Sequence, residues 1–259
     1  MLPFPGRPWS QLQLGVDTIV PTNDIKVLGV TLSSDLTMDK HVFNVCSAGC
    51  YQLRQLRRVR RSLDTESAAT FVHAFVTSRI DYCNVLLAGA PKATTDKLRR
   101  LLNTAARLLS GTKKLDRGLS QVFPVDLYWL DVPERVKYQL VTMAYNCLHG
   151  KAPSYLIDCC TPTSDVSSRR HLRSASRRQL LVPRHNLSTY GRLAFSVAGP
   201  AAWNCLCDDL REPLLTANSF RQLLKTRLFV KYIQRIRGIA HYALYKSTYL
   251  LTTHKQIYA

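Results

Sequence analysis

The chain has 259 residues and carries 36 Lys and Arg against 17 Asp and Glu, a formal net charge of +19. Its 46% hydrophobic content excludes a chain that is disordered throughout, because enough apolar side chain is present to offset the entropy of folding. No uncharged apolar stretch approaches the length of about 18 residues that a membrane-spanning helix requires. We expect an intracellular protein of one or two domains, in the nucleus or cytoplasm, with reduced cysteines and no membrane partner.

Residues 12–32 predict a β-hairpin. The segments LQLGVDTIV and IKVLGVTL are rich in β-branched residues, and the turn-forming residues PTND at 21–24 separate them. Because a single hairpin is only marginally stable, we expect this one to dock on other parts of the fold.

From Asp39 to about Gly150 the apolar residues recur with a period near 3.6, which predicts four amphipathic helices in a small bundle. The first begins at Asp39, Asp64 caps the second, the third follows Pro91, and Pro133 lies in the first turn of the fourth. The expected apolar faces contain Val42, Val45, Gly49, Leu53, Leu56, Ala68, Phe71, Val72, Phe75, Val76, Leu98, Leu101, Leu102, Ala105, Leu109, Val136, Leu140, Met143, Ala144 and Cys147.

The remaining sequence predicts a small mixed region. Residues 161–179 are rich in Ser and Arg and indicate a basic loop. Short strands are expected at 179–183 and 191–199, followed by a helix over 219–233. The predicted fold class is therefore mainly α, with an N-terminal β-hairpin, a helical bundle and a mixed α+β C-terminal region.

Catalytic and metal-binding patterns have little support. Asp208 and Asp209 are adjacent carboxylates, but no third carboxylate is placed to join them, and a solvated turn is the simpler interpretation. The cysteines have no histidine at zinc-finger spacing, and no phosphate-binding glycine loop or hydrolase signature is present. We expect no catalytic residue, metal, cofactor or small-molecule substrate.

Arginine clusters are the strongest remaining signal. Three groups stand out in the sequence: residues 57–61, residues 99–107, and residues 169–178 of the basic loop. Guanidinium groups bind phosphate oxygens and release counterions, so such clusters favour nucleic acid. The alternative is a set of solvated helix faces that bind no ligand. The candidate backbone-binding residues are Lys26 of the expected hairpin and seven arginines chosen by charge and helix position: Arg57, Arg58, Arg60, Arg61, Arg99, Arg100 and Arg107.

Several blocks resemble a known family when they are taken together. They are KVLGVTLSSDLTMDKHV (26–42), AFVTSRIDYCNVLLAGAP (74–91), NTAARLL (103–109), LYWLDVPERVKYQLVTMAYNCLHGKAPSYL (127–156), FSVAGPAAWNCL (195–206) and SFRQLLKTRLF (219–229). Their order and spacing resemble the C-terminal part of reverse transcriptases from LINE-type non-LTR retrotransposons of the jockey-like and chicken-repeat-like group. Tyr128, Asp131 and Cys207 depart from that pattern and suggest drift in a degraded copy.

The resemblance implies a primer-grip hairpin within residues 1–38, a thumb-like bundle at 39–160, the basic loop at 161–179, a mixed region at 180–233 and an unrecognised tail at 234–259. It also implies that the palm, with its paired catalytic aspartates, and the endonuclease lie outside this chain. The expected function is that of a truncated RNA-directed DNA polymerase fragment that cannot polymerise alone but retains binding to an RNA/DNA primer–template backbone. Its other implied partner is the palm domain of the parent enzyme. The alternatives are an inert translated relic and a protein-interaction module.

Overall fold

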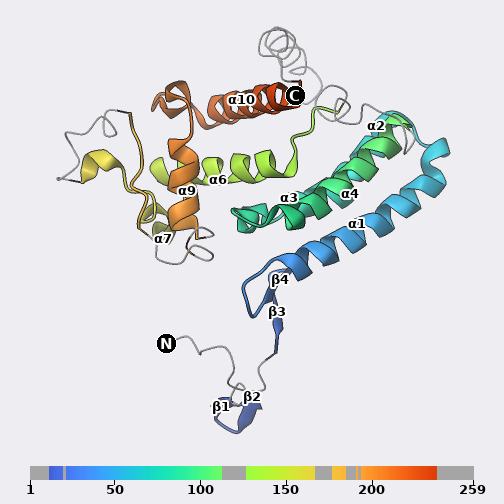
Figure 1. Cartoon of the computed structure of the whole chain (residues 1–259), viewed down its shortest axis with the longest axis horizontal. Helices are drawn as coiled ribbons and strands as arrows, with labels where there is room; N and C mark the ends of the chain where they lie inside the picture. The colour runs from blue at the N-terminus through green and yellow to red at the C-terminus, as the bar shows by residue number, and fades with distance from the viewer. Residues whose placement is uncertain are drawn as a thin grey trace.

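The computed structural model describes residues 12–19, 22–112, 127–166, 177–184, 191 and 194–237, and it is mainly α as predicted (Figure 1). In that figure two small hairpins lie at the bottom, the helices up to residue 110 on the right, and the later helices toward the left and top. The unrecognised tail after residue 237 lies outside the described residues.

The N-terminal strands form two short hairpins, so the predicted single hairpin with its turn at 21–24 is wrong. β1 (Leu12–Leu14) pairs with β2 (Asp17–Ile19), and β3 (Asp24–Val27) pairs with β4 (Val30–Ser33). The second turn contains Leu28 at φ 48° and Gly29 at φ 85°. Two consecutive positive φ values are typical of the tight turns that match strand twist, so the glycines inside the expected strands are turn residues.

The first three predicted helices are confirmed. α1 spans Asp39–Val59 and continues as a 3-10 turn at Arg60–Ser62. α2 (Thr65–Val72) begins at Asp64, whose carboxylate accepts hydrogen bonds from two backbone N–H groups of the first turn. It continues through a π-helical segment, His73–Thr77, into α3 (Ser78–Asp81) and a 3-10 turn at Asn84–Leu87. α4 spans Lys92–Ser110 after Pro91.

α1 and α4 pack side by side and run parallel. At one end the Thr94 hydroxyl donates to the Asp39 carboxylate over 2.8 Å. At the other end Arg60 reaches the carbonyls of Leu108 and Leu109. This packing brings the C-terminal ends of both helices, and the basic residues near them, to the same end of the bundle.

Neither of the two short strands expected in the later part of the chain forms among the described residues. α6 (Val132–Leu148) has Pro133 in its first turn as predicted, and α7 (Ser154–Ile157) and a 3-10 turn at Thr163–Asp165 follow. Within 179–183 only Leu180 forms a bridge, to Pro162, and 195–199 lies in α9 (Phe195–Asn204). A 3-10 turn at Asp208–Arg211 precedes α10 (Ala217–Arg237).

Two buried clusters form the core, and α6 contributes to both. Val132, Val136 and Leu140 join the cluster made by α1, α2 and α4. Tyr145 and the other buried residues near the C-terminal end of α6 join a second cluster with α9 and α10, where the Tyr145 ring stacks on Phe220 at 4.2 Å between centroids. α6 therefore joins the expected bundle to the C-terminal region.

Candidate nucleic-acid interface

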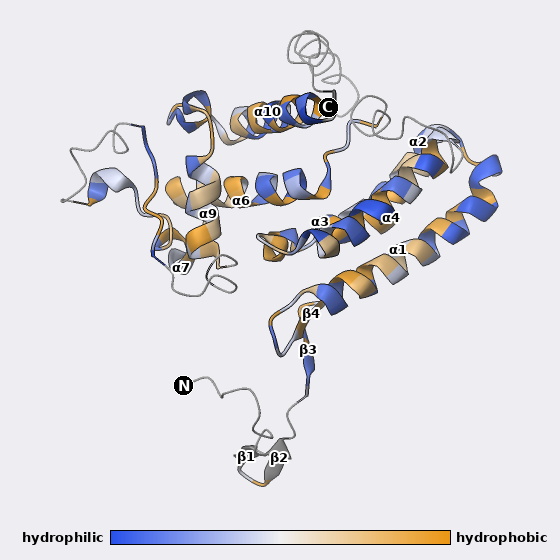
Figure 2. Cartoon of the chain, in the orientation of Figure 1, coloured by the Kyte–Doolittle hydropathy of each residue, from blue (hydrophilic) through white to orange (hydrophobic). Residues whose placement is uncertain are grey.

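Four exposed arginines gather at the C-terminal end of α1. We call Arg54, Arg57, Arg58 and Arg61 the α1 arginine stripe. Residues 54, 58 and 61 follow one another at helical spacings of four and three, so they share a face, and Arg57 flanks it. Within the described part of the chain none of the four side chains makes a hydrogen bond or an ion pair. Figure 2 shows the largely hydrophilic ribbon at this end of the helix.

Arg60, the one arginine of the predicted run that is not in the stripe, has a structural role. Arg60 donates through Nη1 to the Leu63 carbonyl over 2.9 Å, and through Nε and Nη2 to the Leu108 and Leu109 carbonyls over 3.4 Å. The last carbonyls of a helix have no partner within the helix, and a cation near them is favourable. Arg60 thus fixes the end of α1 against the last turn of α4.

The three predicted arginines of α4 lie in different environments. Arg100 is exposed, whereas Arg107 is half-buried with its Nε lacking a hydrogen-bond partner among the described residues. Arg99 donates through Nε to Asp131 over 3.0 Å and forms an ion pair with the same carboxylate. Since Arg107 lies one turn before Ser110, where α4 ends, it is the α4 arginine nearest the stripe.

Lys26 is far from the stripe. It is exposed on β3, and this hairpin lies beside the start of α1, where Lys40 pairs with Asp24. The 21 residues of α1 correspond to about 30 Å at 1.5 Å per residue. The structure therefore brings together Arg57, Arg58 and Arg61 but not Lys26.

The basic loop is described only at its edges. Residues 167–176, with three of its arginines, lie outside the described residues. Arg177 forms an ion pair with Asp208 at 3.3 Å, and Arg178 forms one with Glu212 at 3.1 Å. These two arginines are partly neutralised, unlike the α1 arginine stripe.

The adjacent carboxylates form ion pairs with arginines. Asp208 pairs with Arg177 and Arg211, and the hydrogen bond from Arg177 is the main reason that its pKa is lowered. Asp209 pairs with Arg227. Among the described residues no group of three or more His, Cys, Asp or Glu side chains is arranged to hold a metal ion.

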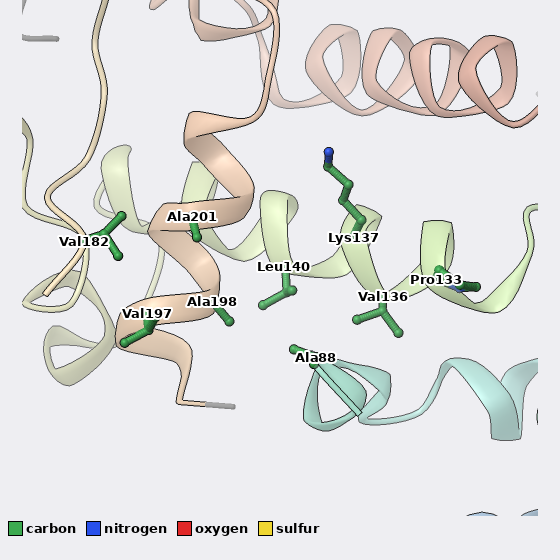
Figure 3. A pocket seen from close by; sticks show the side chains of 10 residues that line it. Ala88, Pro133, Val136, Lys137, Leu140, Val182, Val197, Ala198 and Ala201 are labelled. Atoms are coloured by element: carbon green, nitrogen blue, oxygen red, sulfur yellow. The ribbon is translucent and has the colours of Figure 1, made fainter. Parts of the chain in front are cut away.

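One apolar pocket of about 480 Å³ lies between α6, α9 and the segment after the Asn84–Leu87 turn. Val136, Leu140 and Ala198 line it, and Lys137 is the charged residue at its edge (Figure 3). In the figure the Lys137 amino group points toward α10, away from these three side chains. Burial, followed by the nearby Lys231, lowers the pKa of Lys137. The pocket therefore offers a ligand mainly apolar contacts.

Two features of the candidate interface were missed at the sequence level. Arg54 lies outside the arginine run, yet its spacing to Arg58 and Arg61 was a usable signal. Tyr51 lies on the same face and leaves 57% of its surface exposed.

Comparison with known proteins gave no relatives: no protein-family model, curated protein or solved structure matches the chain. In the part of the chain that the structure describes, no helix is long and apolar enough to cross a membrane.

Proposed function

We propose that this chain binds the nucleic-acid backbone through the α1 arginine stripe, as the thumb-like part of a fragment related to RNA-directed DNA polymerases. The observation that carries the proposal is the group of four exposed arginines, free of carboxylate partners among the described residues, at the C-terminal end of α1 and in the 3-10 turn that follows it. Guanidinium groups bind phosphate oxygens in a bidentate geometry. The polymerase relationship is supported by the sequence blocks alone.

The fold holds the stripe in place. Arg60 fixes the end of α1 to α4 through the Leu108 and Leu109 carbonyls, and Leu53 and Leu56 anchor the opposite face of the same turns in the core. A ligand therefore meets arginines whose backbone is already ordered, and only their side chains lose freedom on binding. Preordered contacts of this kind lower the entropic cost of association.

Salt dependence of oligonucleotide binding tests the proposal. If all four arginines contact phosphates, log K should fall with log salt at a slope of about −3.6 on duplex DNA and about −2.8 on a single strand. Replacing all four by Gln should abolish most of that slope. A variant with Gln at Lys92, Lys151, Arg184 and Arg221 is a matched control, because it removes the same charge from exposed sites elsewhere.

The outcomes are distinct. If both quadruple variants reduce the slope equally, overall charge drives binding and the α1 site is wrong. If wild type shows no salt dependence, backbone binding itself is contradicted.

A primer-extension assay with divalent metal accompanies the titration. We expect no incorporation by this chain, since the resemblance assigns the catalytic aspartates to the palm.

A further inference from the structure

We infer that the α1 arginine stripe, together with Tyr51, forms a site for single-stranded nucleic acid, in which the tyrosine ring stacks on a base while Arg54 and Arg58 bind the neighbouring phosphates. The inference rests on the proposed function and adds the strandedness of the ligand. Single-strand sites combine a positively charged track along the backbone with aromatic rings on which bases stack.

The geometry of α1 supports this arrangement. Tyr51, Arg54 and Arg58 follow at spacings of three and four, so one face presents the ring and both guanidinium groups. A rise of 1.5 Å per residue separates them by about 4.5 and about 6 Å along the axis, and long arginine side chains can adjust this spacing to neighbouring phosphates. Phe43, 64% exposed, lies two turns before Tyr51 at the edge of the same solvent face and can extend the platform.

The exposure of Tyr51 distinguishes a stacking role from a packing role. Tyr51 leaves 57% of its surface exposed, and no hydrogen bond or ring contact holds it within the described part of the chain. The neighbouring core positions of the helix are already filled by Leu53 and Leu56, which are almost fully buried. The tyrosine is therefore not needed to complete the hydrophobic core.

Duplex nucleic acid offers no unstacked base to the Tyr51 ring on this face of α1. In a duplex the bases are stacked on one another and only their edges face the grooves. A ring on the surface of α1 would then contact the sugar–phosphate backbone, where stacking is unavailable. A single strand has unstacked bases that can lie on an aromatic side chain, so the combination of Tyr51 with two arginines favours a single strand.

Fluorescence anisotropy on the full chain tests the inference. The probes are dye-labelled oligothymidylate and oligouridylate of about 12 nucleotides, a length within known single-strand site sizes, and a DNA duplex of equal length. Tyr51→Ala should weaken binding to the single strands about 5- to 150-fold and change duplex binding less than about twofold. Tyr51→Phe keeps the ring and should retain wild-type affinity. Tyr155→Ala is the matched control, because Tyr155 is 68% exposed on α7.

Ultraviolet crosslinking provides a readout that a merely structural tyrosine would not change. A 5-bromouracil oligonucleotide should crosslink to the peptide that contains Tyr51, and Tyr51→Ala should remove that adduct.

If Tyr51→Ala weakens binding to the single strands and to the duplex equally, or weakens neither, the inference is overturned. If the salt slope persists while Tyr51→Ala has no effect, backbone binding stands and the stacking site falls. If wild type binds none of the probes, both fail. A loss confined to oligouridylate or oligothymidylate assigns the site to RNA or DNA.

Discussion

The carboxylate of Asp131 has two roles at the start of α6. It accepts a hydrogen bond from the Val132 backbone N–H over 2.8 Å, which caps the helix, and it pairs with Arg99 of α4. The Asp131 side chain is 2% exposed, whereas that of Arg99 is 39% exposed. Asp131, one of the residues that the resemblance led us to expect as drift, is therefore integrated into the fold.

Because Asp131 is buried and Arg99 is partly exposed, replacing each residue should lower the stability of the protein by a different amount. Arg99→Ala leaves a buried carboxylate without its cation and should cost about 3 kcal/mol, the lower end for a broken buried pair because the Val132 N–H remains. Asp131→Ala should cost about 1 kcal/mol, mainly for the lost cap, since Arg99 can turn to water. Urea unfolding measures both.

Arg100→Ala is the control for that experiment, because Arg100 is the exposed neighbour of Arg99 on α4 and should change stability by less than about 0.5 kcal/mol. A larger loss of stability for Asp131→Ala than for Arg99→Ala would show that the helix cap, and not the buried charge, contributes most to stability at the start of α6.

At the scale of elements, periodicity predicted the long helices well and the short strands poorly. α1 and α4 each bury one apolar stripe, α6 buries residues toward both clusters, and an apolar spacing of three and four over many residues predicts a helix in all three. The segment Phe195–Val197 has residues that favour strands, yet it begins α9. There Val197, Pro200 and Trp203 are buried at spacings of three, so packing against α6 overrides local preference.

In the candidate site, too, the sequence predicted one part and the fold determined the rest. The arginine run was visible in sequence, but the direction of each side chain depends on where α1 changes to a 3-10 turn at Arg60. Arg60 consequently packs against the end of α4 while Arg58 and Arg61 face solvent. The partnership of Arg99 with Asp131 joins residues 32 positions apart, which local patterns cannot reveal.

The contact between α1 and α4 depends on Gly49. A Cβ at this position would lie 2.6 Å from Cδ2 and 3.1 Å from Cδ1 of the buried Leu101. Alanine gains about 1 kcal/mol over glycine in helix propensity, but overpacking costs about 1–3 kcal/mol. Gly49→Ala should therefore destabilise the protein by about 1 kcal/mol, as measured by urea unfolding.

Two further variants make the Gly49 test specific. Ser47→Ala, on the exposed face of the same helix, should cause no loss. Combining Gly49→Ala with Leu101→Val should cost less than the sum of the single variants, because the smaller side chain makes room for the methyl group. A Gly49→Ala protein that is more stable than wild type would contradict close α1–α4 packing.

Across the whole molecule, the positive surplus is unevenly distributed. Many acidic side chains are already paired with cations, among them Asp39 with Lys97, Asp81 with Arg135 and Glu134 with Arg235. These pairs cancel charge locally and leave the unpaired arginines to set the surface field. The α1 arginine stripe is such a group, which links the +19 of the composition to one place on the fold.

Because α6 supplies residues to both buried clusters, we expect the clusters to unfold together, and two cysteines can report on this. Burial raises the pKa of Cys46, beside the first cluster, to about 11 and that of Cys160, in the second, to about 12. From an ordinary value of 9.0, these shifts reduce the thiolate fraction at pH 8 by about 100-fold and about 1000-fold, so both thiols should resist alkylation in the native protein. The exposed Cys83 and Cys205 should react at once.

In increasing urea, tandem mass spectrometry should show Cys46 and Cys160 becoming reactive at the same denaturant concentration. Labelling of one well before the other would mean that α6 does not couple the two cores.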